Sequence, residues 1–320
     1  MPEAPPALPS RLILGTARLA GNGPALPGSM RGAAALELLD RALELGIRAL
    51  DTAAIYQFGG SERLIGSWMR DAGVRDRIYL ISKGGHPSLL GRGRLGRADL
   101  ERDLTASLRR LRTDRLDLYL LHRDLPGAPL EPIAETLWSF VADGRVRAYG
   151  VSNWTHERFV ALRALALRRG MPPPAASSPQ FSLPQWVATP YPGCVSIGGP
   201  GSAAALRAYR DTGAAVLAWS PLGSGWLRAS GGRARSRAYR GAANDARHGR
   251  LAELAKGVGC TPAQVALAWV LAHGRSVHAI VGTQRPERLA ELQRALELAL
   301  DPGQLAWLTD GPEEASVIAE

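Results

Sequence analysis

The feature that most constrains the fold is a regular alternation of short apolar runs with longer amphipathic runs along the 320 residues. The short runs are apolar throughout, which is typical of strands buried on both faces of a parallel sheet. We expect these strands within 12–16, 47–52, 77–82, 116–122, 146–152, 175–178, 214–220 and 277–282. In most of the runs between them, apolar residues repeat at intervals of three and four, which is typical of amphipathic helices. We expect these helices within 32–46, 61–70, 97–111, 132–144, 155–170, 202–213, 250–259, 261–274 and 285–298.

Eight strand–helix units in a chain of this length predict a (β/α)₈ barrel, formed by a single domain spanning residues 1–320. The alternative is a doubly wound open sheet, which requires a G-x-G-x-x-G turn directly after the first strand. The chain reads ARLAGNGPALPG there, and its glycines do not have that spacing. Residues 221–249 show no periodicity, so we expect a long loop after the seventh strand that acts as a lid or cofactor clamp.

The charge balance raises the question of a nucleic-acid partner, because the net charge is +10 and the pI is near 10.4. The excess is mostly arginine scattered along the chain, and no helix-turn-helix, zinc finger or basic aromatic platform accompanies it. We therefore expect no specific nucleic-acid partner. The interpretation that we favour is a surface biased toward arginine, and the alternative is a positive field that attracts anionic ligands such as nucleotide phosphates.

Composition indicates a water-soluble globular protein, since 46% of the residues are apolar and 21% are charged. No run of 18 apolar residues predicts a membrane span, and the N-terminus lacks the pattern of a signal peptide. We expect a cytoplasmic protein. Cys194 and Cys260 lie far apart and show no metal-ligand spacing, so we expect neither a metal site nor a structural disulfide.

Ionisable side chains follow three successive predicted strands. Asp51 ends the second strand with Tyr56 in the following loop, Lys83 ends the third strand, and His122 ends the fourth. Each residue alone fits a structural role, such as a turn cap for Asp51 or a solvent-exposed lysine for Lys83. Because the active site of a (β/α)₈ barrel lies at the carboxyl ends of its strands, we expect all four side chains to meet there.

These four groups suit a proton transfer. A tyrosine with its ordinary pKa near 10 is a weak acid at neutral pH, and a neighbouring ammonium group such as Lys83 lowers that pKa. Asp51 can hold Lys83 in its charged form, and His122 can hydrogen-bond the oxygen of a substrate. This predicts protonation of a carbonyl oxygen while a hydride from nicotinamide attacks its carbon.

At this point the chain resembles the aldo-keto reductase superfamily, over residues 12 to about 300. The resemblance rests on the motifs ALDTAAIYQFGGSERLIG, ISKGG, LHRD, GRVRAYGVSNW, AWSPLGSG and IVGTQRPERLAE, in this order. It implies a (β/α)₈ barrel that uses NAD(P)H without a Rossmann domain. It also implies that Asp51, Tyr56, Lys83 and His122 form the catalytic tetrad, with Tyr56 as the general acid.

The resemblance also implies a set of cofactor-binding residues. These are Ser152, Asn153 and Ser178 at the nicotinamide, Trp219 as the stacking aromatic residue, Ser220, Leu222 and Gly223 at the pyrophosphate, and Gly282, Thr283, Gln284, Arg285, Arg288 and Glu291 at the adenosine end. The family usually has a glutamine at the position of Ser178, and Gln180 lies two residues on, so either residue is a candidate for that contact. Arg285 and Arg288 favour NADPH over NADH, because guanidinium groups pair well with a 2′-phosphate. Leu292 stands where the family often has an asparagine beside the adenine.

The expected substrate is a small aldehyde or ketone, such as a sugar or another polar metabolite. Trp186 and Trp226 are candidate pocket walls, with packing beneath the loops as the alternative. The basic surface favours an anionic substrate. A second hypothesis is a cofactor-binding sensor or auxiliary subunit, since some members of the superfamily are subunits of potassium channels. A third hypothesis is reduction of conjugated C=C bonds. In this superfamily that activity tends to accompany a different residue at the histidine position, so the presence of His122 makes it less favoured.

Overall fold

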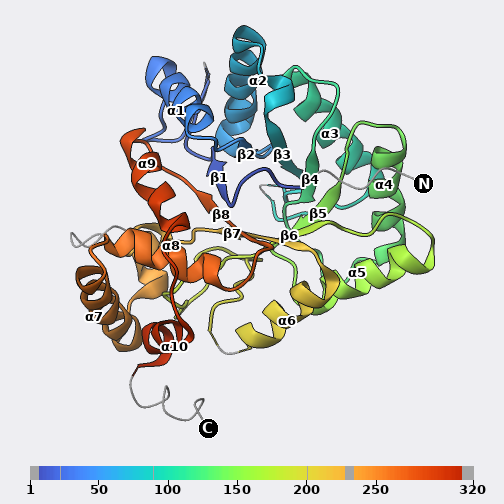
Figure 1. Ribbon diagram of the computed structural model, residues 1–320. Coiled ribbons are helices and arrows are strands. Elements are labelled where there is room, and N and C mark those ends of the chain that lie inside the picture. Colours follow the sequence, from blue (N-terminus) through green and yellow to red (C-terminus); the bar gives the residue numbers. More distant parts are fainter. Residues whose placement is uncertain (1–6, 22, 89, 200, 228–233, 312–320) are drawn as a thin grey trace.

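The eight strands close into one parallel barrel in a computed structural model that describes residues 7–21, 23–88, 90–199, 201–227 and 234–311 (Figure 1). The strands are β1 (Leu12–Gly15), β2 (Ala49–Asp51), β3 (Tyr79–Gly84), β4 (Leu118–Leu121), β5 (Tyr149–Ser152), β6 (Ala176–Ser178), β7 (Ala215–Trp219) and β8 (Val277–Val281). Each strand pairs with its neighbours in the chain, and β8 pairs with β1. The predicted (β/α)₈ barrel is confirmed, and the open sheet is excluded.

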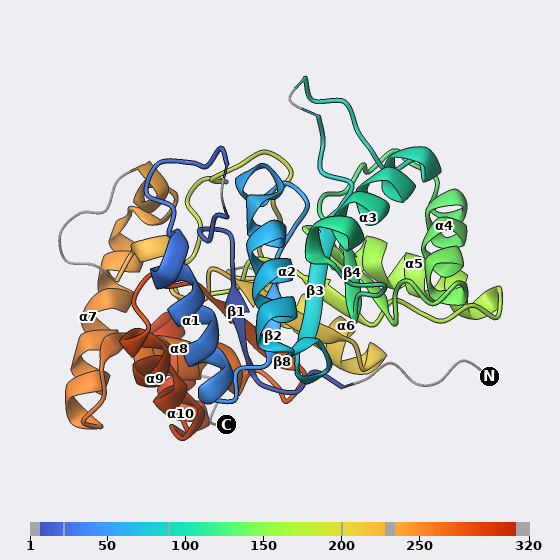
Figure 2. The same ribbon diagram turned by 90° about the horizontal axis from the view of Figure 1, so that it is seen from above.

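The helices surround the barrel as an outer ring (Figure 1). They are α1 (Gly32–Glu44), α2 (Gly60–Ala72), α3 (Arg97–Leu111), α4 (Leu130–Ala142), α5 (His156–Arg168), α6 (Ser202–Thr212), α7 (Ala242–Gly257), α8 (Pro262–Ala272), α9 (Glu287–Gln293) and α10 (Pro302–Asp310). Five short 3₁₀ turns accompany them: η1 (Tyr56–Gly59), η2 (Arg75–Arg77), η3 (Gly223–Gly225), η4 (Ala234–Tyr239) and η5 (Arg294–Leu296). The C-terminal loops of the strands gather on one side of the barrel, and the loop between β3 and α3 projects farthest from it (Figure 2).

Buried apolar side chains form two separate groups because side chains alternate between the two faces of a strand. One group fills the barrel interior and includes Ile13, Ile81, Leu120, Leu217 and Ile280. The other lies between the strands and the ring of helices. Both faces of every strand are therefore covered, which explains why the strands read as continuous apolar runs rather than as alternating ones.

The structure corrects three details of the expected secondary structure. Helix α7 begins at Ala242, so the expected loop 221–249 ends before that residue. Residues 228–233 of this loop lie outside the described residues. Gly249 and the polar residues around it conceal the helical pattern there. A further helix, α10, was not expected. Helix α2, expected within 61–70, begins at Gly60 with Gly59 as its N-cap, and Ser61 lies buried inside the helix.

Helix α8 begins with a complete capping box. The Thr261 hydroxyl accepts a hydrogen bond from the backbone of Gln264, the Gln264 side chain bonds back to Thr261, and Pro262 occupies the first turn. Among the described residues, no single helix is long and apolar enough to cross a membrane. Only α7 and α8 taken together pass that test, and they are bent by 102° relative to each other.

Candidate active site

The alternation of side chains within the strands places the expected site residues inside the top of the barrel. Lys83 lies two residues beyond Ile81, which belongs to the interior group, and His122 lies two residues beyond Leu120. Asp51 follows the interior residue Ala49 in the same way. Because residues two apart share a face, these three polar side chains continue the interior stack at its open end. The same alternation of side chains thus places both the interior core and the site.

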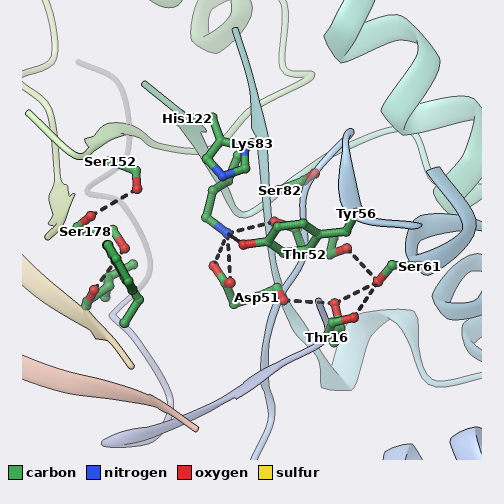
Figure 3. A network of polar contacts seen from close by, with 12 residues as sticks. Thr16, Asp51, Thr52, Tyr56, Ser61, Ser82, Lys83, His122, Ser152 and Ser178 are labelled. Atoms are coloured by element: carbon green, nitrogen blue, oxygen red, sulfur yellow. Dashed lines mark hydrogen bonds and ion pairs between the residues drawn. The ribbon is translucent and has the colours of Figure 1, made fainter. Parts of the chain in front are cut away.

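The four residues of the predicted tetrad come together there (Figure 3). Lys83 Nζ donates a hydrogen bond of 2.7 Å to Asp51 Oδ2 and lies 3.2 Å from the phenolic oxygen of Tyr56. It also donates to the carbonyl oxygen of Thr52 at 3.0 Å. Asp51 and Lys83 are 2% and 3% exposed, whereas Tyr56 is half-buried. The phenol is therefore the member of this chain of contacts that a substrate can reach.

His122 lies beside the phenol rather than in the chain of contacts. Its ring is 5.7 Å from the ring of Tyr56, measured between centroids, and meets it edge to face. Burial, reinforced by the positive charges of Lys83 and Arg123, holds the pKa of His122 well below its ordinary value. The imidazole is neutral at neutral pH, so it carries one N–H donor and one acceptor nitrogen. No protein group bonds its Nδ1 among the described residues.

The pKa of Tyr56 is shifted in the direction opposite to the one expected from the sequence. Burial raises the pKa of Tyr56, and the opposing pull of the Lys83 ammonium only reduces that increase. Burial also disfavours the charge on Lys83, but Asp51 and Tyr56 outweigh it and raise the pKa of Lys83. Tyr56 is therefore protonated and Lys83 charged at neutral pH. Position in sequence reveals the neighbour of a titratable group, but it does not reveal how deeply the group is buried.

A network of hydroxyl groups beneath the tetrad was missed by the sequence reasoning (Figure 3). The Thr16 hydroxyl donates to the carbonyl oxygen of Asp51 at 2.9 Å, and the Ser61 hydroxyl donates to the carbonyl oxygen of Thr16 at 3.0 Å. The hydroxyl groups of Thr52 and Ser61 are 3.0 Å apart. All three residues are fully buried. The network ties β1, β2 and α2 together and so positions the backbone of Asp51.

A buried ion pair supports the neighbouring strand. The Ser82 hydroxyl donates to Glu62 Oε1 at 2.6 Å, and Arg110 Nε donates to Glu62 Oε2 at 2.6 Å. Glu62 is completely buried, and both of its oxygens are bonded, as a buried polar group requires. This arrangement holds α2 and α3 against β3, next to Lys83. Neither a serine in a strand nor a glutamate in a helix carries a sequence signal for such a role.

The loop after Tyr56 is held by Gln57, which was also not expected. Gln57 Nε2 donates to the carbonyl oxygen of Ala17 at 2.6 Å, and its Oε1 accepts from the backbone of Leu26 and the hydroxyl of Ser29. Gln57 has a φ of 52° and Phe58 a φ of 55°, both in the left-handed region that disfavours ordinary side chains. The contacts of Gln57 offset the cost of this strained backbone. They thereby fix the loop that carries Tyr56.

Three of the residues expected at the nicotinamide lie side by side at the ends of β5 and β6. The Ser152 hydroxyl donates to the carbonyl oxygen of Ser178 at 3.0 Å, and the Ser178 hydroxyl donates to the carbonyl oxygen of Leu217 at 2.9 Å. Asn153 Nδ2 donates to the Ser152 hydroxyl and to the carbonyl oxygen of His122. A φ of 59° turns Asn153 away from the strand direction. These hydrogen bonds connect the residues expected at the nicotinamide to His122 of the tetrad.

Gln180 has a structural environment that separates it from Ser178. Its Nε2 donates to the Ser182 hydroxyl at 2.7 Å, and its Oε1 accepts from the Ser196 hydroxyl at 2.5 Å. Its Nε2 also contacts the hydroxyl of Tyr239 at 3.3 Å. Gln180 is completely buried, and its amide is engaged on both atoms. It therefore joins the loop after β6 to η4, while Ser178 lies inside the barrel end.

Trp219 ends β7 on the interior face, two residues beyond Leu217. Its indole Nε1 donates to Asn153 Oδ1 at 3.2 Å, and the ring of Trp186 lies 5.7 Å away between centroids. Trp226 packs edge to face on His248 at 5.2 Å instead. Of the expected pocket walls, only Trp186 thus lies against Trp219. The indole of Trp219 is oriented by one hydrogen bond, which leaves its ring a flat apolar surface.

The expected pyrophosphate loop follows Trp219. Ser220 and Ser224 have φ values of 51° each, and the Ser224 hydroxyl donates to the Ser220 hydroxyl at 2.9 Å. Leu222 precedes Gly223, which has a φ of 63° and begins η3. A Cβ at Gly223 would lie 2.7 Å from Pro184 Cγ, so only glycine fits this turn.

The residues expected at the adenosine end follow β8. Gly282 lies directly beyond β8, and Gln284 Nε2 donates to the carbonyl oxygen of Gly28 at 2.6 Å. The Thr283 hydroxyl accepts from the backbone of Arg285 at 3.1 Å and so shapes the turn.

The guanidinium groups beyond this turn are only lightly engaged. Arg285 is exposed, and the single acidic partner found for Arg288 within the described chain is Glu291, at 3.6 Å. Glu291 also accepts from the Thr261 hydroxyl at 3.3 Å. Leu292 is buried, so the family's asparagine at this position is replaced by a core residue.

Metal-binding clusters of histidine, cysteine, aspartate and glutamate are absent from the described residues. Cys194 and Cys260 are both free thiols. The site thus consists of a proton-donating phenol, a charged lysine, a neutral imidazole and a nearby aromatic surface.

Comparison with known proteins gives a consistent result. Residues 11–310 match the profile of the Aldo/keto reductase family. A 6-dehydroglucose reductase of Novosphingobium aromaticivorans is 34% identical over 298 residues, which cover 90% of this chain and 87% of that protein. The NADP(+) aldo-keto reductase yakc of Schizosaccharomyces pombe is 28% identical, with 88% and 83% covered. A solved thermostable aldo-keto reductase in complex with the inhibitor epalrestat superposes with a TM-score of 0.72 at 27% identity, over 95% of each chain.

Proposed function

Because this chain belongs to the aldo/keto reductase family and is an NAD(P)H-dependent oxidoreductase of carbonyl and alcohol groups, we propose that it uses NADPH to reduce an aldehyde or ketone with Tyr56 as the general acid. The observation that carries the proposal is the chain of contacts from Asp51 through Lys83 to the half-buried phenol of Tyr56. No other ionisable group of the tetrad combines a proton available at neutral pH with access to a substrate.

The protein side of the reaction follows from these positions. Tyr56 donates its proton to the carbonyl oxygen while the carbonyl carbon accepts a hydride, so the product is an alcohol and Tyr56 is left as a phenolate. The Lys83 ammonium, at 3.2 Å, stabilises that phenolate, and Asp51 keeps Lys83 charged. His122, being neutral, donates one hydrogen bond to the same oxygen and fixes the direction of the carbonyl. Proton uptake from solvent restores Tyr56.

The residues around the tetrad fit a nicotinamide dinucleotide. The bound cofactor supplies the hydride. Trp219 offers a flat ring oriented by Asn153, while Ser152, Asn153 and Ser178 present the amide and hydroxyl groups that suit a carboxamide. Ser220, Leu222 and Gly223 form a strained turn beside them, which suits close approach of a pyrophosphate.

The far end of the predicted cofactor site favours NADPH over NADH. Within the described residues, the side chain of Arg285 has no partner and that of Arg288 has only Glu291, so both offer N–H donors that a 2′-phosphate would engage. Gly282, Thr283, Gln284 and Glu291 are the other residues that we propose at this end of the cofactor. The name of the Schizosaccharomyces pombe relative carries NADP(+), which supports the same choice. We also propose a single barrel domain over residues 1–320 in which the described part of the expected loop 221–249 that precedes α7, residues 221–227 and 234–241, clamps the cofactor.

The substrate is proposed to be a small polar aldehyde or ketone. One relative is a 6-dehydroglucose reductase, which supports a sugar aldehyde as the first compound to test. Trp186, against Trp219, is the proposed aromatic wall on which a sugar or an aromatic carbonyl would pack.

The test combines binding and turnover. Quenching of tryptophan fluorescence by NADPH and NADH is measured for the wild type and Tyr56→Phe, followed by NADPH oxidation with a panel of aldehydes, ketones and sugar aldehydes. We expect both proteins to bind NADPH and the wild type to turn over at least about 10²-fold faster, the usual contribution of a general acid. Binding without turnover of any carbonyl would favour a cofactor-binding sensor or auxiliary subunit. Equal rates for both proteins would exclude Tyr56 as the acid.

A further inference from the structure

Arg123 follows His122 directly, at the end of β4, and its charge has no role in the mechanism above. Its Nη1 donates to the carbonyl oxygen of His122 at 3.0 Å, which holds the side chain against the catalytic strand end. The side chain also runs beside the loop after β6, because a Cβ at Gly193 would lie 3.7 Å from Arg123 Cδ. Arg123 is half-buried, so part of the residue is exposed to solvent next to the end of β4.

Several groups around the mouth sense this charge. The positive charge of Arg123 acts to lower the pKa of Tyr56, of His122 and of the Cys194 thiol. It also acts to lower the pKa of His86, which lies on the loop after β3. These groups come from four different loops. The guanidinium group therefore lies among them rather than on the outer wall of the barrel.

His86 completes the same wall of the site. Its ring lies 5.0 Å from the ring of His122 between centroids, on an edge-to-face contact. Tyr56 contacts His122 in the same manner, so His122 lies between a phenol and a second imidazole. His86 is half-buried, and its Nδ1 lies 2.9 Å from the carbonyl oxygen of Pro87.

Carboxylates near this wall are already paired with other arginines. Asp124, the next residue in the chain, is 2.9 Å from Arg158 Nε, and Asp103 pairs with Arg94. Within the described part of the chain, Arg123 forms no ion pair with aspartate or glutamate. Comparable half-buried arginines, such as Arg110 with Glu62, do have such partners. A cation held without an anion near a catalytic site is a common arrangement for binding an anionic group of the substrate.

We propose that Arg123, on the wall that it shares with His86, binds an anionic group of the substrate, so that the preferred substrates are aldehydes or ketones carrying a carboxylate, sulfonate or phosphate. The inference rests on the proposed function, since it assigns the substrate class of the same site. The carbonyl group lies at Tyr56 and His122, and the anionic group lies on the side of His122 that faces Arg123. Arg123 then decides specificity without taking part in proton transfer.

The test uses two aldehydes that differ in charge and little in shape, 4-carboxybenzaldehyde and methyl 4-formylbenzoate. The ratio of their kcat/KM values is measured for the wild type, Arg123→Lys, Arg123→Gln and Arg77→Gln. The ratio is internal to each protein, so a general loss of activity cancels. Arg77 is exposed in η2, just before β3 at the opposite end of the barrel, and its variant controls for attraction by the overall positive charge.

We expect the wild type to prefer the carboxylate and Arg123→Gln to lose roughly ten- to hundredfold of that preference, the range of a charge-assisted hydrogen bond. Arg123→Lys should retain part of it, and Arg77→Gln should match the wild type. Added salt should reduce the preference in every protein that keeps a positive charge at position 123 and leave the ratio of Arg123→Gln nearly unchanged. Equal ratios in the wild type and Arg123→Gln, with both aldehydes turned over, would overturn the proposal.

A binding measurement separates this inference from the proposed function. Calorimetry compares 4-(hydroxymethyl)benzoate with its methyl ester, on the protein mixed with NADP⁺. Tighter binding of the carboxylate that disappears in Arg123→Gln supports the anion site even if neither aldehyde is reduced, and in that case the proposed reductase activity fails instead. Equal binding of both alcohols to the wild type overturns the anion site.

Discussion

Lys83 Nζ lies 2.7 Å from Oδ2 of Asp51, and both side chains are more than nine-tenths buried at the open end of the barrel. The pair places a positive charge inside the protein where the phenolate of Tyr56 would form. Removing one member of such a pair leaves the other charge buried without compensation.

Lys83→Met should therefore reduce both activity and stability. We expect kcat to fall by at least about 10²-fold, as for loss of acid–base assistance. The free energy of unfolding should fall by about 3–5 kcal/mol. The double variant Asp51→Asn, Lys83→Met is the control, because it removes both charges and should recover much of that loss. Urea unfolding monitored by circular dichroism gives the values; a double variant no more stable than Lys83→Met would argue against the pair as the cause.

The same pair predicts how stability depends on alkaline pH. The pKa of Lys83 is raised in the folded protein, so its contribution to stability is fully present below the ordinary lysine pKa of about 10.4. The contribution is lost as the pH rises from there through the folded pKa. Thermal unfolding near pH 9 and pH 11 should show a larger decrease for the wild type than for the double variant. Parallel decreases would contradict the assignment.

Activity toward a neutral aldehyde should be insensitive to pH around neutrality. His122 has a pKa well below the ordinary histidine value of about 6.5, and Tyr56 has a pKa above the ordinary tyrosine value of about 10. Both groups therefore keep the required protonation state between about pH 6.5 and 9. The profile of kcat/KM against pH should be flat there. A limb with a midpoint near the ordinary histidine pKa would show that His122 is less shielded than its burial indicates.

Arg288→Ala should weaken binding of NADPH and leave NADH nearly unaffected. A charge-assisted hydrogen bond to a 2′-phosphate predicts a loss of roughly ten- to hundredfold in NADPH affinity. Arg294→Ala is a matched control on the neighbouring η5 turn, where the side chain is exposed. Fluorescence titration with both cofactors measures the effect. An equal loss for NADPH and NADH would show that Arg288 does not recognise the 2′-phosphate.

Gln180 and Ser178 should behave differently when they are replaced. Gln180→Leu removes an amide with three partners and leaves their polar groups buried, which costs about 1–3 kcal/mol of unfolding free energy for each unsatisfied group. Ser178→Ala removes one hydrogen bond, to Leu217, and should cost only about 1 kcal/mol. We expect cofactor affinity to fall mainly in Ser178→Ala. Melting temperatures and cofactor titrations of both variants would reveal the reverse pattern if Gln180 contacts the nicotinamide.

Two helical glycines should respond in opposite ways to alanine. A Cβ at Gly66 in α2 would lie 2.4 Å from the carbonyl oxygen of Arg110, whereas a Cβ at Gly249 in α7 meets no atom within 4 Å. Gly66→Ala should therefore destabilise the protein by about 1–3 kcal/mol through overpacking. Gly249→Ala should stabilise it by about 0.5–1 kcal/mol through helix propensity. Chemical denaturation of both variants checks this; equal effects would mean that α2 can move away from α3.

The barrel and the location of the site could be predicted from sequence because one pattern determines both. Buried parallel strands read as apolar runs, and the first polar residue of the same parity after each run points into the mouth of the barrel, as Lys83 and His122 do. The supporting contacts carry no such pattern. Ser61 and Glu62 do not stand out in the sequence, but tertiary packing buries both. The direction in which the pKa of Tyr56 shifts could not be predicted either, since it depends on how far burial outweighs the charge of Lys83.

The contacts of Gln57 have a consequence for protein engineering. Its amide bonds Ala17, Leu26 and Ser29, all from the loop after β1, although Gln57 itself follows the proposed acid on the loop after β2. The two loops are therefore not independent modules. A chimera that imports the first loop from another barrel enzyme without a matching carbonyl and donors would also disturb the tyrosine on the second. Recombination of this scaffold should exchange the two loops together as one cassette.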